Sequence, residues 1–172
     1  MTNLHSMPGH LIRRLQQISV SLFTTRMNEA GLDLTSVQFA ALATLHDNPG
    51  LDQGTLAGLI AYDRVTIGGV IDRLVQKGLV VRETSPTDRR ARMLLLSPEG
   101  KRTLDYALPW VERVQEDIVA FFSEEERRNF ITLLSKATEA GNDRSRAPLR
   151  HGKGEGEAEP EKEQGAPQRP LP

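Results

Sequence analysis

Apolar residues recur at intervals of three and four positions along most of the first 142 residues, the spacing that places them on one face of a helix. These stripes predict a long helix over residues 8–30 and a second helix that begins after Thr35 and stops at Asn48-Pro49-Gly50. Beyond residue 97 two further stripes predict helices that extend to residue 142, the last of them starting at Ser123.

Two shorter helices are expected between these long ones. Asp52 suits the N-cap of the first and Asp63 that of the second, and the two-residue link Ala61-Tyr62 between them is typical of a helix-turn-helix. The apolar period then changes from helical to extended, so residues 79–84 and 92–96 are predicted to form the two strands of a hairpin. A hairpin directly after the second helix is a wing.

The sequence thus predicts a mainly α fold with a small β-hairpin wing. Residues 35–97 would form a winged helix-turn-helix head, and residues 8–30 and 98–142 would form a helical dimerisation region. The apolar stripes of the flanking helices are longer than a small head needs, and a monomer would expose aromatic side chains such as Trp110 and Phe121. Pairing of two chains would cover this surface, so we expect a homodimer.

The composition changes abruptly at residue 143. Residues 143–172 are rich in Gly, Pro and Glu, their opposite charges nearly cancel, and Leu149 and Leu171 are the only sizeable apolar residues among them. Such a segment buries too little surface to offset its ordering entropy, so we expect a disordered charged tail after a domain of residues 1–142. The simplest interpretation is a solvated tail without specific function; a weak contact with DNA or with a partner is the alternative.

Several classes of function are disfavoured by what the sequence lacks. It has no cysteine, which excludes a disulfide framework, a thiolate nucleophile and a cysteine zinc site. Its four histidines are scattered without ligand spacing, and no phosphate loop, nucleophile elbow or HExxH motif is present, so we expect neither metal, cofactor nor catalytic residues. No apolar run approaches a membrane span and no secretory leader is recognisable, so a cytoplasmic protein that is not an enzyme is expected.

Positive charge is concentrated locally although the chain as a whole carries a formal charge of −1. Between Tyr62 and Arg102 there are nine basic and five acidic residues, an excess of four positive charges around the predicted helix-turn-helix and wing. A basic patch attracts duplex DNA because each neutralised phosphate releases counterions. A solvated face of ion pairs is the alternative, and the accompanying helix-turn-helix pattern favours DNA.

The second helix of the pair offers a set of outward residues near its start. We expect Arg64 to bind guanine, the Thr66 hydroxyl to reach a base or a phosphate, and the methyl groups of Val65 to meet a thymine methyl. Gly69 would let backbone and DNA approach closely, although tight helix packing is an equal alternative for this glycine. Arg73, two turns further on, is better placed for a phosphate.

The tip of the predicted hairpin carries Asp88, Arg89 and Arg90. Asp88 could orient one arginine through a charge-assisted hydrogen bond while the other enters a narrow minor groove. Spacing alone leaves the assignment of the two arginines open.

The segment from Asp63 to Gly100 resembles the MarR family of bacterial regulators. The matching parts are the DRL…KGLV end of the recognition helix, the Asp-x-Arg wing, the LSPEG start of the next helix, and Leu34-Thr35 with Gln38 and Leu42. The resemblance implies a two-fold dimer whose recognition helices enter successive major grooves of double-stranded DNA at a pseudo-palindromic operator. It also implies that Arg90 is the minor-groove arginine and that Asp88 supports it.

Within that family the chain looks most similar to regulators of aromatic-acid breakdown, including that of nicotinate. The resemblance therefore implies a repressor released by a small aromatic carboxylate, such as a hydroxylated nicotinate or benzoate, bound between the dimerisation layer and the head. The residues expected to hold it are His10, Arg13, Arg14, Gln38, Phe39 and Leu42. Solvated arginines and a surface histidine are the alternative for the first three, and a protein-interaction module or a transcriptional activator is the alternative function.

Overall fold

The computed structural model describes residues 3–84 and 92–150. Helices dominate it, and the one sheet in this part of the chain is a two-stranded antiparallel hairpin. The elements in chain order are η1 (Leu4–Ser6), α1 (Pro8–Glu29), α2 (Ser36–Asp47), α3 (Gln53–Leu59), α4 (Ile67–Gln76), β1 (Val80–Thr84), β2 (Arg92–Leu96), α5 (Pro98–Ile118), α6 (Glu124–Gly141) and η2 (Asn142–Arg144). This order confirms the predicted mainly α fold with a hairpin wing.

Polar caps fix where the long helices begin. Thr35 forms a capping box with Gln38 at the start of α2, and Ser123 forms another with Glu126 at the start of α6. Ser97 caps α5 by accepting a hydrogen bond from the Gly100 N–H at 2.9 Å, and its hydroxyl also donates to the Gly78 carbonyl. Each cap satisfies backbone N–H groups that the first turn of a helix leaves free.

The head is built around one apolar core. Side chains from α2, α3, α4 and β2 meet there with at most 2% of their surface exposed: Leu42, Leu45, Leu56, Ile67, Ile71, Leu74 and Leu94. Full burial of such a side chain contributes about 1.5–3 kcal/mol, so this cluster holds the three short helices in a fixed arrangement. That arrangement orients α4, the second helix of the helix-turn-helix.

The wing is anchored at its base against α5. Val80 pairs with Leu96 and Thr84 with Arg92 across the hairpin, and Leu51 forms an isolated bridge with Leu94. A Cβ at Gly100 would lie 2.0 Å from the Leu79 carbonyl oxygen. Glycine is therefore required where the start of α5 crosses the wing, because any side chain would collide with backbone there.

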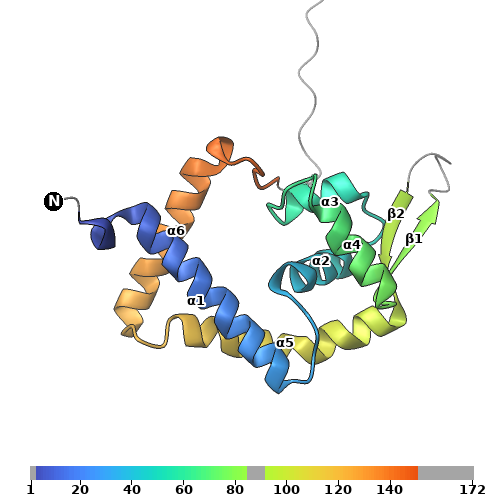
Figure 1. Cartoon of the computed structure of the whole chain (residues 1–172), viewed down its shortest axis with the longest axis horizontal. Helices are drawn as coiled ribbons and strands as arrows, with labels where there is room; N and C mark the ends of the chain where they lie inside the picture. Colours follow the sequence, from blue (N-terminus) through green and yellow to red (C-terminus); the bar gives the residue numbers. More distant parts are fainter. Residues whose placement is uncertain (1–2, 85–91, 151–172) are drawn as a thin grey trace, which may run out of the picture.

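The helices outside the head lie beside it, and two of them, α1 and α5, share its core. Figure 1 shows α2, α3, α4 and the hairpin grouped on one side and α5 running below them. Helix α1 descends on the other side to cross α5, and α6 runs back from the end of α5. Phe23 and Met27 of α1 and Leu104, Ala107 and Val114 of α5 are buried in the common core. Within the described residues no helix is both long and apolar enough to cross a membrane.

The start of α4 differs from the prediction. The regular helix begins at Ile67, so the link after α3 spans residues 60–66 and not the two residues Ala61-Tyr62. Asp63 caps a turn instead: its Oδ1 accepts the Val65 N–H at 2.8 Å, and its carbonyl accepts the N–H groups of Thr66 and Ile67. The prediction that Asp63 is the N-cap of this helix is therefore wrong, since Thr66 occupies that position without a side-chain cap. A turn that does not repeat helically has no signal in apolar periodicity.

The chain continues in contact with the head beyond α6. Asn142 hydrogen-bonds Leu149, and the Arg150 N–H donates to the Gly58 carbonyl at 2.9 Å. These contacts fall within the segment expected to be a tail, and residues 151–172 lie outside the described residues.

Candidate nucleic-acid interface

The inner and outer faces of α4 are sharply different. Ile67, Val70, Ile71 and Leu74 are buried in the head core. The residues predicted to meet DNA are all exposed: Gly69 and Arg73 on α4, and Arg64, Val65 and Thr66 on the turn before it. Their exposure leaves them accessible, and their contact with DNA stays a prediction.

Val65 is the most unusual member of this surface. Its side chain is 90% exposed although it is apolar and lies next to the buried Ile67. Water is a poor environment for two methyl groups, whereas the edge of a thymine presents a methyl group that they would contact. The hydrogen bond from the Val65 N–H to Asp63 fixes the backbone that presents this side chain.

The other residues of the turn are also positioned. The Thr66 hydroxyl donates to the Asp63 carbonyl at 3.1 Å, which leaves its oxygen lone pairs available as acceptors. The guanidinium of Arg64 lies close to Gly54, because a Cβ on that glycine would be 3.8 Å from its Cζ. Arg64 therefore extends across the start of α3, at the junction of the two helices.

Two basic residues counted in the local charge excess are used inside the fold. Lys77 Nζ lies 2.8 Å from Asp33 Oδ2, and Arg82 Nη2 lies 2.6 Å from Asp72 Oδ1. The hydrogen bond from Lys77, reinforced by its charge, lowers the pKa of the Asp33 carboxyl below its ordinary value. These pairs anchor the end of α4 and β1. Asp72 is already among the acids counted, whereas Asp33 lies outside the counted segment, so the Lys77 pair alone lowers the net excess, by one charge.

The base of the wing is described and its tip is not. Arg92 Nη1 donates to the Thr84 hydroxyl at 2.7 Å across the last pair of the hairpin. The expected DNA contacts Asp88, Arg89 and Arg90 lie outside the described residues.

The six residues predicted to hold an effector fall into two groups. His10, Arg13 and Arg14 lie in the first two turns of α1, where Arg13 hydrogen-bonds Gln17 and the His10 ring stacks edge-on against His5. Gln38, Phe39 and Leu42 lie on α2, where Leu42 is fully buried and the Gln38 amide caps the helix. Gln38 is 3% exposed and Leu42 is not exposed at all, so neither offers much open surface to a ligand.

One chain does not bring the two groups together. Phe39 packs near Phe23 of α1, with 6.2 Å between ring centroids. Arg13 precedes Phe23 by ten residues, which corresponds to about 15 Å along a helix. Sequence reasoning placed both groups at the boundary of head and dimerisation layer but could not measure this separation.

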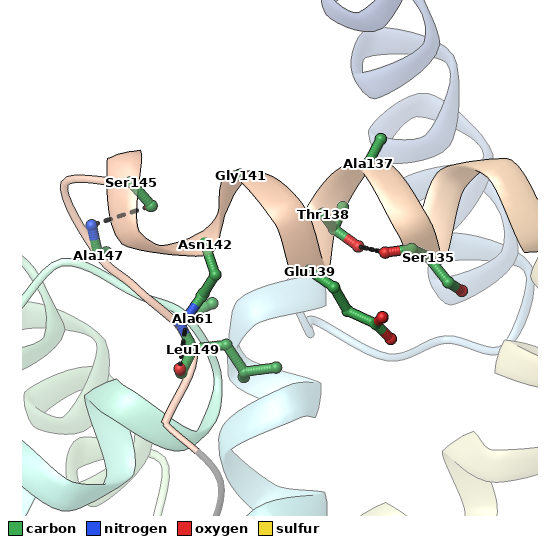
Figure 2. Close-up of a pocket in the computed structure, with 10 residues that line it drawn as sticks. All are labelled: Ala61, Ser135, Ala137, Thr138, Glu139, Gly141, Asn142, Ser145, Ala147 and Leu149. Carbon is green, nitrogen blue, oxygen red and sulfur yellow. Dashed lines mark hydrogen bonds between the residues drawn. The ribbon is translucent and has the colours of Figure 1, made fainter.

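Two hollows adjoin these elements. A cavity of about 420 Å³ between α1, α5 and α6 is lined by apolar side chains that include Ile12, Leu15 and Ile131. Another of about 580 Å³ lies between the C-terminal part of α6 and Ala61 of the head, and Figure 2 shows Asn142 and Leu149 closing one end of it. Sequence reasoning did not identify this second hollow, because it depends on how the chain folds back after α6.

A helix-turn-helix whose second helix presents a basic, exposed N-terminal turn, followed by a hairpin, defines a winged-helix DNA-binding protein. A family model described as the MarR family matches residues 34–91. The transcriptional regulator HosA of Escherichia coli O111:H- is 32% identical over 131 residues, which cover 76% of this chain and 94% of that protein. The chain belongs to the MarR family and is a DNA-binding transcriptional regulator.

The chain is also similar to a transcriptional repressor and to a protein whose DNA binding is regulated by a small molecule. The HTH-type transcriptional repressor NicR of Pseudomonas putida is 31% identical over 128 residues, which cover 74% of this chain and 80% of that protein. The structure of BpsR from Bordetella bronchiseptica, whose DNA binding is regulated by 6-hydroxynicotinic acid, matches with a TM-score of 0.74 at 28% identity. That match covers 80% of this chain and 97% of the other.

Proposed function

We propose that this regulator is a cytoplasmic dimeric repressor that occupies a pseudo-palindromic operator and leaves it when a small aromatic carboxylate binds. The exposed turn Asp63–Thr66 ahead of α4 carries the proposal. Arg64 reads guanine and Val65 contacts a thymine methyl. The Thr66 hydroxyl, which donates to the Asp63 carbonyl, accepts from a base and would reach a phosphate only by giving up that bond. Gly69 admits the DNA backbone, and Arg73 binds a phosphate further along the helix.

The wing would add contacts in the neighbouring minor groove. In this proposal Arg90 enters the groove, where a narrow width raises the negative potential, and Asp88 orients it. Arg89 then binds the phosphate backbone. Replacing Arg90 by Ala should weaken operator binding more than replacing Arg89 does; equal binding by wild type and Arg90→Ala would contradict this assignment.

Dimerisation is supported by the surface of the outer helices. Every residue of α6 has some exposure and none is buried, although a helix of this length depends on packing for its stability. The exposed side chains include Leu133 at 65%, Ile12 at 64% and Phe121 at 92%. Together with the apolar cavity between α1, α5 and α6, they form a surface that a second copy would cover.

The effector site in this proposal lies between the two layers and uses both chains. Arg13 or Arg14 forms the bidentate contact with the ring carboxylate, His10 assists, and Phe39 supplies the apolar wall in front of Leu42 and Gln38. Arg13 of one chain lies about 15 Å along α1 from Phe23, the residue against which its own Phe39 packs. A dimer in which the start of α1 reaches the partner's head removes that difficulty.

Recovery of bound fragments from genomic DNA, followed by titration of the strongest fragment, tests the proposal. We expect one dimer per fragment and release by one member of a panel of hydroxylated benzoates and nicotinates. Leu133→Glu should give monomers that bind poorly, while Leu133→Ala, which keeps an apolar surface, should still dimerise. A monomeric wild-type protein, or one without preference for any fragment at low salt, would overturn the proposal.

A further inference from the structure

The chain that follows α6 turns back and packs on the DNA-binding head. We name residues 142–150 the C-terminal strap. Two hydrogen bonds join the ends of the strap: Asn142 Oδ1 accepts the Leu149 N–H at 2.7 Å, and Asn142 Nδ2 donates to the Leu149 carbonyl at 3.1 Å. Figure 2 shows this closure beside Ala61 of the head. The next residue, Arg150, donates its N–H to the Gly58 carbonyl at 2.9 Å.

Gly58 of α3 leaves room for this contact because it has no side chain. It is buried, and a Cβ added to it would lie 2.9 Å from Cδ, 3.2 Å from Cγ and 3.3 Å from Cβ of Arg150. Those distances are shorter than ordinary carbon contacts. The aliphatic part of Arg150 therefore lies directly on the backbone of α3, which directs the strap across the first helix of the helix-turn-helix.

The strap brings new positive charge to the turn that precedes the recognition helix. Arg146 Nε lies 3.3 Å from Asp63 Oδ2, and the Arg146 side chain remains 89% exposed. Arg146 and Arg150 line one hollow of about 290 Å³ together with Arg64 and Val65. The two strap arginines and the predicted base-reading residues thus share a single surface.

The charge of the strap fits a polyanion. It contains Arg144, Arg146 and Arg150 against the single acid Asp143. An ion pair as exposed as Arg146 with Asp63 contributes little to stability, so it holds the arginine near the turn without consuming its hydrogen-bonding capacity. An Arg guanidinium presents several N–H donors that match phosphate oxygens.

We propose that the C-terminal strap is part of the DNA-binding surface, with Arg146 and Arg150 binding operator phosphates beside the start of the recognition helix. This inference rests on the proposed operator binding. It assigns positioning and affinity to the strap and base recognition to Arg64 and its neighbours, because phosphate contacts carry no direct sequence information.

Salt dependence of operator binding by the full-length protein tests the inference. Arg146→Ala/Arg150→Ala should lower the slope of log affinity against log salt by about 0.9 for each phosphate that is no longer neutralised, hence by about 3 to 4 in a dimer. The Lys double variant, which keeps the charge, should restore most of the slope, and the order of preference among operator sequences should not change. Arg128→Ala, an exposed arginine near the opposite end of α6, is the matched control and should behave as wild type.

Two results would overturn the inference. One is an unchanged slope and affinity in the double Ala variant. The other is tighter binding in that variant, which would mean that the strap covers the recognition surface. The single variant Arg146→Ala is the control for misfolding. Its side chain is almost fully exposed, so its removal should leave the fold intact and any change in binding reports on the contact with DNA. Absence of specific binding by the wild-type protein would instead count against the proposed function.

Discussion

Arg26 of α1 and Asp117 of α5 are joined by a two-pronged ion pair, in which Nη2 and Nε lie 2.7 Å and 2.8 Å from the same Asp117 oxygen. The two residues are 91 positions apart in sequence, and the pair lies at the crossing of the helices. Arg26 also contacts Glu29 one turn away at 2.9 Å. Because α5 leads directly from the wing, this pair helps to set the position of the head relative to the outer layer.

Breaking the pair should lower the melting temperature most at low salt. Asp117→Asn keeps the size of the side chain and removes its charge, so Arg26 loses the partner that connects it to α5. Salt screens partly exposed charges, and the difference from wild type should therefore shrink as salt is raised. Calorimetry at two ionic strengths measures this.

Glu29→Gln is the matched control for that prediction. It removes the other carboxylate of Arg26, which lies within the same helix and is more exposed, so a smaller change is expected. Equal melting temperatures for Asp117→Asn and wild type at both salt concentrations would show that the pair has no role in stability.

Acid should weaken the start of α3 through Asp52. The hydrogen bond from the Thr55 hydroxyl, with further bonds from the Thr55 and Gly54 N–H groups, holds the pKa of Asp52 below its ordinary value of 3.8. A carboxyl whose pKa is lower in the folded state stabilises the fold fully above its unfolded value. That stability is lost as the pH falls through the folded pKa. We expect unfolding by urea to become easier below about pH 4.

Substitution at Asp52 separates the cap from the charge. Asp52→Ala should cost about 1 kcal/mol at neutral pH because two N–H groups lose their acceptor. Asp52→Ser keeps a cap that does not titrate, so its stability should depend less on pH between 5 and 2 than that of wild type. If the stability of wild type and of Asp52→Ser falls equally with acid, the ionisation of Asp52 is not its cause.

Gly69 offers a test in which stability and binding should move in opposite directions. A Cβ at this position would meet nothing within 4 Å in the protein, so Gly69→Ala should stabilise α4 by about 0.5–1 kcal/mol. If DNA approaches this backbone closely, the same methyl group should weaken operator binding. Thermal unfolding and fluorescence anisotropy measure the two effects.

Gly68→Ala is the companion variant for Gly69. Its Cβ would face Gln53 of α3 at 3.4 Å, away from open solvent. It should change operator affinity less than Gly69→Ala does. Wild-type affinity in Gly69→Ala would mean that DNA does not approach the helix at this point.

Whether a part of the fold could be predicted from the sequence depends on the kind of interaction that holds it in place. The helices of the head are recognisable from a buried face that repeats every 3.6 residues, and Ile67, Val70, Ile71 and Leu74 identify α4, although not the residue at which it begins. The turn at residues 64–66 is held by hydrogen bonds to Asp63, which have no periodic signal. The packing of Arg150 on Gly58 joins positions 92 residues apart, and composition alone indicated only a polar tail.

The candidate DNA surface and the candidate effector site also differ in how far the sequence could predict them. The free side of α4, with Gly69 and Arg73, was predictable because the hydrophobic side of that helix determines which side is exposed. Arg64, Val65 and Thr66 lie on the turn before the helix, and their contact with DNA stays a prediction. The effector residues lie on two helices, so their relation depends on tertiary distances that a sequence does not contain. The separation of Arg13 from Phe39 is the consequence.

Effector response should depend on the start of α1. Replacing Arg13 or Arg14 by Ala should leave operator affinity near the wild-type value and reduce release by the aromatic acid, because the carboxylate loses its bidentate partner. Gln17→Ala, which removes the hydrogen-bond partner of Arg13 without removing a charge, should have the milder effect. Unchanged ligand-induced release in both arginine variants would reject this site.

Binding of Arg64→Ala and Arg73→Ala to a complete set of single-base operator variants tests the central claim, that the turn before α4 reads DNA. Arg64→Ala should cost about 1–3 kcal/mol and lose discrimination at one position in each half-site. Arg73→Ala should weaken all sequences alike and lower the salt slope by about 1 for each phosphate that the arginine no longer neutralises. Unaltered base preference in Arg64→Ala, together with full affinity in both variants, would contradict the account.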